Sequence, residues 1–234
     1  MILAAGLGTR FKPWTDHHPK ALALVNGKSL LQRNIEYLQQ YGIREVVVNV
    51  HHFAGQIVEA LTINKGWGSR FIISDETEEV LETGGGLKKA GPFLEDAPFV
   101  LMNVDILTDM DLSALAGDHF LHRPLATLAV TDRSTSRYFL FDREQQLRGW
   151  RNVRTGEQRM AGTASPLVQK AFSGIHVIDP SIFPLITRQG KFSMVDLYLE
   201  LAAGHPIRGF DHSRSKLIDV GKPESAVLAA QLFP

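Results

Sequence analysis

Residues 3–20 read LAAGLGTRFKPWTDHHPK. The apolar run Ile2–Ala5 predicts a buried strand that ends in a glycine turn. The turn Gly6-Leu7-Gly8 predicts several free backbone N–H groups, because glycine tolerates positive φ and lets an anion approach closely. Arg10 adds a planar, permanent charge suited to phosphate, and Lys20 adds a mobile charge on the far side of the turn. The stretch therefore predicts a loop that cradles a triphosphate.

Two well-known phosphate loops do not fit this stretch. The dinucleotide fingerprint G-x-G-x-x-G requires a glycine at the position of Phe11. The P-loop pattern G-x-x-x-x-G-K-[ST] requires a second glycine followed by lysine, and neither the count from Gly6 nor that from Gly8 supplies this pair. The stretch therefore predicts a phosphate loop of another kind.

The segments beyond this loop alternate between strand and helix patterns up to about residue 115. We expect buried strands at Glu45–Val50, Phe71–Ser74 and Phe99–Asn103, and helices after Ser29, at Gly55–Leu61 and entering from a loop at Thr83–Ala90. This alternation is typical of parallel βαβ units in an α/β protein. Later segments predict shorter strands at Leu125–Val130, Tyr138–Phe141, Leu147–Arg151, Ala171–Val177, Ile207–Phe210 and Leu217–Val220, with helices at Pro180–Ile186, Val195–Ala203 and Pro223–Leu232.

Two aspartates follow apolar strands at distant places in the chain. Asp105 follows the run FVLMN, and Asp219 lies in KLIDVGKPE. Ligands of α/β sheets bind at the carboxyl ends of the strands, and Mg²⁺ prefers one or two carboxylates together with phosphate oxygens. An aspartate after a strand is also a common turn or capping residue. The residues alone therefore leave both interpretations open.

Residues 81–86 read LETGGG, three consecutive glycines that we expect before a helix. Such glycines permit close approach of a planar base or a ribose to the backbone. Glycines alone are equally typical of a flexible turn.

Taken together, these motifs resemble the signature of the sugar-1-phosphate nucleotidyltransferases, LAAG-x-GTR-x-x-P-x-T-x-x-x-PK. The match covers Leu3, Ala4, Ala5, Gly6, Gly8, Thr9, Arg10, Pro13, Thr15, Pro19 and Lys20. The form LETGGG is similar to that of the bacterial N-acetylmuramate-1-phosphate uridylyltransferases. The resemblance implies an α/β, Rossmann-like three-layer sandwich with a mixed, mainly parallel central sheet. It implies a single domain, residues 1–234, with a nucleotide-binding half at about 1–115 and a sugar-phosphate-binding half at about 116–234.

The resemblance also implies a site. Arg10 and Lys20 are expected to be catalytic, and Asp105 and Asp219 are expected to hold Mg²⁺. The substrates are a nucleoside triphosphate and a sugar 1-phosphate. Asn103 and Gly174, the latter in AFSGIHVIDP, are expected to contact the sugar. Nucleotide contacts are expected from Leu3, Ala5, Gly6, Gly8, Thr9, Arg10, Lys20, Glu82, Thr83 and Gly84.

The chain also departs from the family pattern. Val104 replaces a glycine before Asp105, Leu217 replaces a common tryptophan, and Lys222 replaces a frequent threonine. The E-K-P motif, whose lysine holds the sugar phosphate in many relatives, is missing, so one arginine of the basic segment 133–154 is a candidate replacement. UTP with N-acetylmuramate 1-phosphate is the preferred substrate pair. A mannose-1-phosphate guanylyltransferase, another NTP specificity and a non-catalytic nucleotide-sugar sensor remain alternatives.

Composition sets further limits. The 234 residues are 44% hydrophobic and 21% charged, with zero formal net charge. These values favour an ordinary globular protein and give no sign of a nucleic-acid-binding or membrane-binding surface. The absence of cysteine excludes disulfides and cysteine-ligated metals. No apolar run of 18 residues occurs, so we expect a soluble, cytoplasmic protein without membrane or nucleic-acid partners; the oligomeric state is not predicted.

Overall fold

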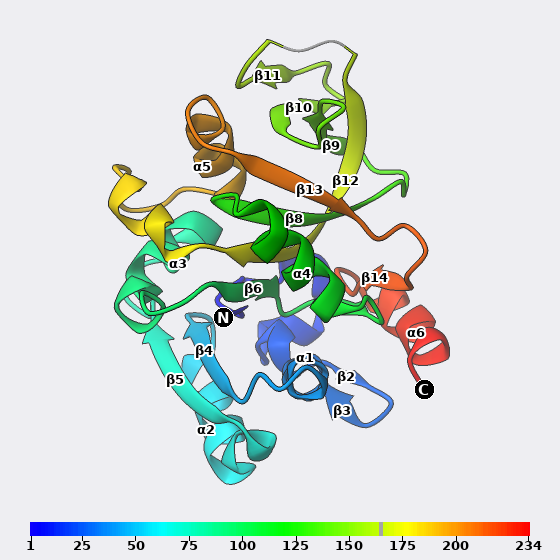
Figure 1. Ribbon diagram of the computed structural model, residues 1–234. Helices are drawn as coiled ribbons and strands as arrows, with labels where there is room; N and C mark the ends of the chain where they lie inside the picture. Colours follow the sequence, from blue (N-terminus) through cyan, green and yellow to red (C-terminus); the bar gives the residue numbers. More distant parts are fainter. Residues whose placement is uncertain (164–165) are drawn as a thin grey trace.

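The computed structural model describes residues 1–163 and 166–234 (Figure 1). Its main sheet has ten strands, in the order β11-β10-β9-β12-β6-β1-β4-β5, and β8 links β12 to β13. The strands of this sheet are β1 Ile2–Leu3, β4 Glu45–Val50, β5 Arg70–Asp75, β6 Phe99–Asn103, β8 Ala126–Thr131, β9 Arg137–Phe141, β10 Leu147–Asn152, β11 Gln158–Met160, β12 Val168–Ile178 and β13 Ile207–Asp211.

Four neighbouring strands, β6, β1, β4 and β5, run parallel to one another. Their carboxyl ends meet at one edge of the sheet, where α/β proteins bind ligands. Beyond β6 the long strand β12 runs antiparallel and pairs with β6, β8 and β9, whereas β8 and β13 are parallel to each other. The predicted α/β fold with a mixed sheet is confirmed.

Helices cover both faces of the sheet. Strand β4 shows why: its valines reach both faces, with Val46, Val48 and Val50 in one hydrophobic cluster and Val47 in the other. Side chains alternate between the faces of a strand, so a strand buried on both faces needs apolar residues at every position. Residues of α1 Leu30–Gln40, α2 Ala54–Ile63, α4 Leu112–His122 and α6 Pro223–Leu232 join the first cluster, and residues of α3 Glu82–Ala90 and α5 Met194–Leu201 join the second.

The predicted helix after Ser29 is confirmed, with a clear cause at its start. The Ser29 hydroxyl accepts a hydrogen bond from the Gln32 backbone N–H at 3.1 Å, which satisfies one of the free donors of the first turn. Helix α4 was not predicted. Asp111 caps it in the same way, accepting from Ser113 N–H at 2.9 Å. The predicted helix at Pro180–Ile186 is a 3₁₀ helix, Pro180–Leu185, and its prolines oppose longer α-helical pairing.

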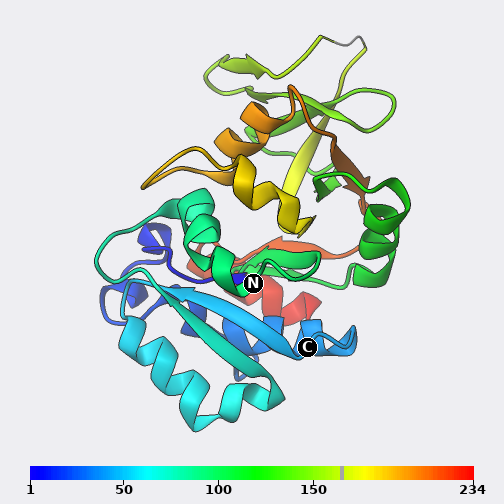
Figure 2. The same ribbon diagram turned by 60° about the vertical axis from the view of Figure 1, so that its left-hand side comes forward.

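Two smaller sheets complete the fold. Strand β7, Ile106–Thr108, pairs antiparallel with β14, Leu217–Asp219, and β2, Leu24–Val25, pairs with β3, Lys28–Ser29. In Figures 1 and 2 strands β10 and β11 lie at one end of the molecule and α2 at the other. Within the described residues, no helix has the length and apolar character needed to cross a bilayer.

Candidate active site

The signature loop leaves β1 at Leu3 and is built from three short 3₁₀ turns, Thr9–Phe11, Trp14–Asp16 and Lys20–Leu22. Gly8 takes a left-handed conformation, with φ of 61°, and its carbonyl accepts hydrogen bonds from Phe11 N–H at 2.8 Å and from the Thr15 hydroxyl at 3.0 Å. Glycine is therefore the residue that this turn requires.

Strand β4 and the segment after it hold the loop from behind. The side-chain oxygen of Asn49 accepts the Ala4 backbone N–H at 2.6 Å, and His52 Nε2 lies 3.0 Å from the Thr15 carbonyl. Asn49 is buried, which explains a polar residue inside the apolar run EVVVNV. A buried hydrogen bond of this kind fixes the loop against the sheet.

Gly8→Ala is expected to lower the free energy of unfolding by roughly 1–3 kcal/mol, through left-handed strain and crowding. A Cβ at this position would lie 2.8 Å from Cγ2 of Thr15. Gly6→Ala is the matched control, because a Cβ at Gly6 meets no atom within 4 Å. Urea unfolding followed by circular dichroism measures both variants. Equal midpoints for the two variants would contradict a structural requirement at Gly8.

The two predicted metal-binding aspartates lie side by side. Asp219 ends β14 opposite Ile106, the residue after Asp105, and Val220 N–H donates to the Asp105 carbonyl at 2.8 Å. The Lys20 ammonium forms an ion pair with the Asp105 carboxylate. Desolvation and the neighbouring Asp105 raise the pKa of Asp219, and the charges of Lys20 and Arg10 partly oppose this rise. The structure thus brings together all four charged residues singled out in the sequence.

Gly221 joins Arg10 to this acidic pair, a function that sequence analysis did not assign to it. A Cβ on Gly221 would lie 3.0 Å from Nη2 of Arg10 and 2.7 Å from Oδ1 of Asp219. The absence of a side chain at this position lets the guanidinium approach the aspartate. The motif Asp219-Val220-Gly221 therefore supplies both a carboxylate and the space beside it.

A cleft of about 550 Å³ opens in front of the loop. Eleven of the predicted site residues line it, namely Leu3, Ala5, Gly6, Gly8, Thr9, Arg10, Lys20, Glu82, Thr83, Asn103 and Asp105. Gly84, Gly174 and Asp219 are not among its lining residues, although Gly221, two residues from Asp219, is. The cleft lies at the carboxyl ends of β1 and β6, as expected for a ligand site of an α/β sheet.

A family model described as Nucleotidyl transferase matches residues 1–146. A relative from Caulobacter vibrioides, named N-acetylmuramate alpha-1-phosphate uridylyltransferase, is 34% identical over 98% of this chain and 94% of its own length. The chain belongs to the nucleotidyltransferase family.

Other similar proteins differ in the nucleotide that their names specify. The D-glycero-alpha-D-manno-heptose 1-phosphate guanylyltransferase of Campylobacter jejuni is 31% identical to this nucleotidyltransferase, over 96% of this chain and 95% of its own length. The crystal structure of HddC from Yersinia pseudotuberculosis complexed with GMP-PN covers 100% of this chain and 98% of its own, with a TM-score of 0.79 and 22% identity. That structure shares the fold of this nucleotidyltransferase.

The LETGGG motif lies differently from the sequence-based expectation. Helix α3 of this nucleotidyltransferase begins at Glu82, so its glycines lie inside the helix and not in a loop before it. The N–H groups of Gly84 and Gly85 both donate to the Phe192 carbonyl, at 2.9 and 3.2 Å. A Cβ on Gly84 would lie 2.5 Å from the Phe192 ring. The glycines therefore allow close packing against the segment before α5, and Glu82 and Thr83 form the wall of the cleft.

Glu76 is a buried member of the cleft wall that sequence analysis missed. One carboxyl oxygen accepts a hydrogen bond from Asn49 Nδ2 at 2.8 Å, and the other, Oε2, is buried without a hydrogen-bond partner in the described residues. Burial raises the pKa of this carboxyl, and the bond from Asn49 partly offsets the rise. Asn49 thus joins the phosphate loop to Glu76. The sequence signal that could have indicated this contact was Asn49, a polar residue inside the valine-rich strand β4.

The two predicted sugar contacts, Asn103 and Gly174, are brought together. Gly174 lies within an irregularity of β12, between Phe172 and His176, and has a φ of 73°. A Cβ on Gly174 would lie 2.7 Å from Nδ2 of Asn103 and 3.1 Å from Cγ1 of Ile106. Both the positive φ and the lack of space for a side chain require glycine at this position. Asn103 therefore lies where the predicted nucleotide-binding half meets the predicted sugar-phosphate-binding half.

The donor set fits the magnesium that the resemblance implies. No cluster of three or more His, Asp or Glu side chains suited to a metal occurs in the described part of the chain. Asp105 lines the cleft and Asp219 lies next to Asp105, and Mg²⁺ is commonly held by one or two carboxylates plus substrate phosphates and water. Two carboxylates therefore suit a Mg²⁺ ion that binds together with a nucleotide better than an ion that the protein alone coordinates fully.

Proposed function

We propose that this nucleotidyltransferase transfers a nucleotidyl group from an NTP to a sugar 1-phosphate in a Mg²⁺-dependent reaction. UTP and N-acetylmuramate 1-phosphate, or a similar sugar phosphate, form the proposed substrate pair. The observation that carries this proposal is the convergence of Asp105, Asp219, Lys20 and Arg10 at the glycine loop. The name and near full-length similarity of the Caulobacter relative support the uridine nucleotide and the sugar.

The chain's residues suggest how the reaction proceeds. A phosphate oxygen of the sugar 1-phosphate attacks the α-phosphorus of the NTP, a new P–O bond forms, and the bond to the β-phosphate oxygen breaks, releasing pyrophosphate. That oxygen is ionised at neutral pH, so the site needs no general base. Catalysis then consists of positioning and of neutralising negative charge. Bound Mg²⁺ would supply a Lewis acid that neutralises phosphate charge.

Each charged residue has a separate task in this mechanism. Arg10 binds the β- and γ-phosphates with its planar fork and holds the leaving pyrophosphate. Lys20 neutralises the α-phosphate, where charge builds up during transfer. Asp105 and Asp219 hold the ion. Gly6 and Leu7 are exposed residues that line the cleft, and their N–H groups bind the phosphates from the other side in this mechanism.

A substrate panel tests the proposal. Purified protein is incubated with Mg²⁺, each of UTP, GTP, CTP, dTTP and ATP, and a set of sugar 1-phosphates, and pyrophosphate release is measured. We expect release with UTP and N-acetylmuramate 1-phosphate, and none after EDTA is added. Release only with GTP and mannose or heptose 1-phosphate would establish the guanylyltransferase alternative. Binding of nucleotide sugars without release for any pair would instead establish a sensor.

A further inference from the structure

The predicted sugar-phosphate half has no E-K-P lysine, yet a sugar 1-phosphate carries a doubly charged group. The structure shows a cation on the segment after β8 that has no ion-pair partner among the described residues. Arg133 lies in the segment directly after β8, its side chain is exposed, and Nη2 donates to the Phe172 carbonyl at 2.8 Å. No carboxylate of the described residues lies within ion-pair distance of its guanidinium.

The position of Phe172 connects Arg133 to the cleft. Phe172 precedes the irregularity of β12 that contains Gly174. Gly174 borders both Asn103, which lines the cleft, and Ile106, which pairs with Asp219. Arg133 does not itself line the cleft; its guanidinium lies beside the β12 residue two positions before Gly174, the glycine that borders Asn103.

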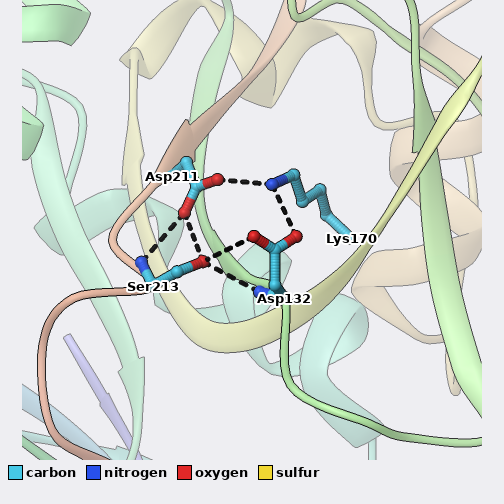
Figure 3. A network of polar contacts seen from close by, with 4 residues as sticks. All are labelled: Asp132, Lys170, Asp211 and Ser213. Carbon is cyan, nitrogen blue, oxygen red and sulfur yellow. Dashed lines mark hydrogen bonds and ion pairs between the residues drawn. The ribbon is translucent and has the colours of Figure 1, made fainter.

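A network of polar and charged side chains holds Asp132, the residue before Arg133 (Figure 3). Lys170 on β12 forms ion pairs with Asp132 Oδ1, at 2.7 Å, and with Asp211 at the end of β13. Ser213 accepts the Asp132 backbone N–H at 2.9 Å and donates to Asp211 Oδ1 at 2.5 Å. These contacts join the ends of β8 and β13 to β12 and hold the residue immediately before Arg133. Lys170 is paired with two carboxylates and is therefore not available to bind phosphate.

Several neighbouring cations are engaged by other side chains or lie elsewhere. Arg148 pairs with Asp142, Arg159 pairs with Asp196, and Arg151 donates to Gln169. Arg143 follows the end of β9, which pairs with Val168 at the far end of β12 from Gly174. Arg133 differs from them in that its hydrogen bond reaches β12 at Phe172, two residues before Gly174.

We propose that Arg133 binds the phosphate of the sugar 1-phosphate, in the place that a lysine from another segment takes in relatives with the E-K-P motif. This inference rests on the proposed function. A guanidinium has five N–H donors in a planar fork, and only one of Arg133's is used by Phe172, so a bidentate pair with phosphate remains available. The Phe172 bond orients the fork, and the Lys170 network keeps the loop from moving away.

The test is Arg133→Gln, compared with Arg143→Gln as a control that removes the same charge from an exposed site. Steady-state kinetics should show KM for the sugar 1-phosphate raised by about 10- to 100-fold in Arg133→Gln, as expected for a lost charge-assisted hydrogen bond. KM for the NTP should stay within about twofold, because the charge of Arg10 and the loop are untouched. Arg133→Lys, which keeps the charge but loses the fork, should give an intermediate KM. Arg143→Gln should match the unmodified protein.

Calorimetric titration of the sugar 1-phosphate separates this inference from the proposed function. Binding that is strong in the unmodified protein and weak in Arg133→Gln supports the role of Arg133 even if no tested NTP supports turnover. An unchanged KM and an unchanged affinity in Arg133→Gln overturn it while leaving the nucleotidyltransferase activity intact. No binding by the unmodified protein overturns the role of Arg133, and pyrophosphate release then decides the proposed function by itself. Circular dichroism of each variant verifies that it is folded.

Discussion

Asp105→Asn is expected to lower kcat by at least about 1,000-fold, because a neutral amide replaces one of two proposed metal-binding carboxylates. The fold should survive, since Val220 donates to the Asp105 backbone carbonyl, which the substitution leaves in place. Initial rates of pyrophosphate release over a range of Mg²⁺ concentrations measure the effect. We also expect the Mg²⁺ concentration for half-maximal rate to rise, which a merely structural role would not cause.

Asp96→Asn is the matched control for this prediction. Asp96 is an exposed aspartate that precedes β6, at the end of the strand opposite to Asp105, and its removal changes the net charge by the same amount. Its kinetics should equal those of the unmodified protein. Turnover by Asp105→Asn within about tenfold of that protein, with unchanged Mg²⁺ dependence, would remove Asp105 from the proposed metal site.

Lys20→Met is expected to lower kcat by about 100- to 1,000-fold, with a smaller effect on KM for the NTP. Methionine keeps the length of the apolar stem but loses the charge that we assign to the α-phosphate. Lys20 is only 9% exposed, so its charge acts in a partly desolvated site. Single-turnover measurements at saturating NTP isolate the transfer step from product release.

Lys28→Met controls for the loss of a lysine. Lys28 is more exposed and pairs with Glu36 at 2.6 Å on the surface, where ion pairs contribute little. Its kcat should be unchanged. If Lys20→Met mainly raises KM for the NTP and leaves the transfer step intact, Lys20 contributes to ground-state binding and not to the stabilisation of developing charge.

The regular part of the fold was predictable because its sequence signals are strong. Four of the six residues of Glu45–Val50 are valines, so a strand buried on both faces suits this segment. Helix α4 was missed even though Asp111 gives a capping signal, since the following LSALAGDHFLH has only Leu112, Leu115 and His119 buried. Such a sparse apolar stripe does not indicate a helix until β8 and β12 are present to pack against it.

The candidate site was predictable in its residues but not in all its contacts. The signature loop and the two aspartates follow patterns whose chemistry requires a charged residue at each place. The positions of Glu76, Gly221 and Arg133 depend instead on which distant strands become neighbours, and local pattern does not encode that pairing. For the same reason LETGGG looked like an open loop: the Phe192 segment that covers Gly84 lies about half the chain away.

The antiparallel pairing of β7 with β14 has a consequence for synthesis on the ribosome. A nascent chain that has reached residue 200 already contains the phosphate loop, Lys20 and Asp105, but not the partner strand that carries Asp219. Such an intermediate lacks one of the proposed magnesium ligands and also Ile218, Val220 and Ala229, which complete the first hydrophobic cluster. Competence for chemistry is therefore acquired late in translation, well after the nucleotide-facing loop has emerged.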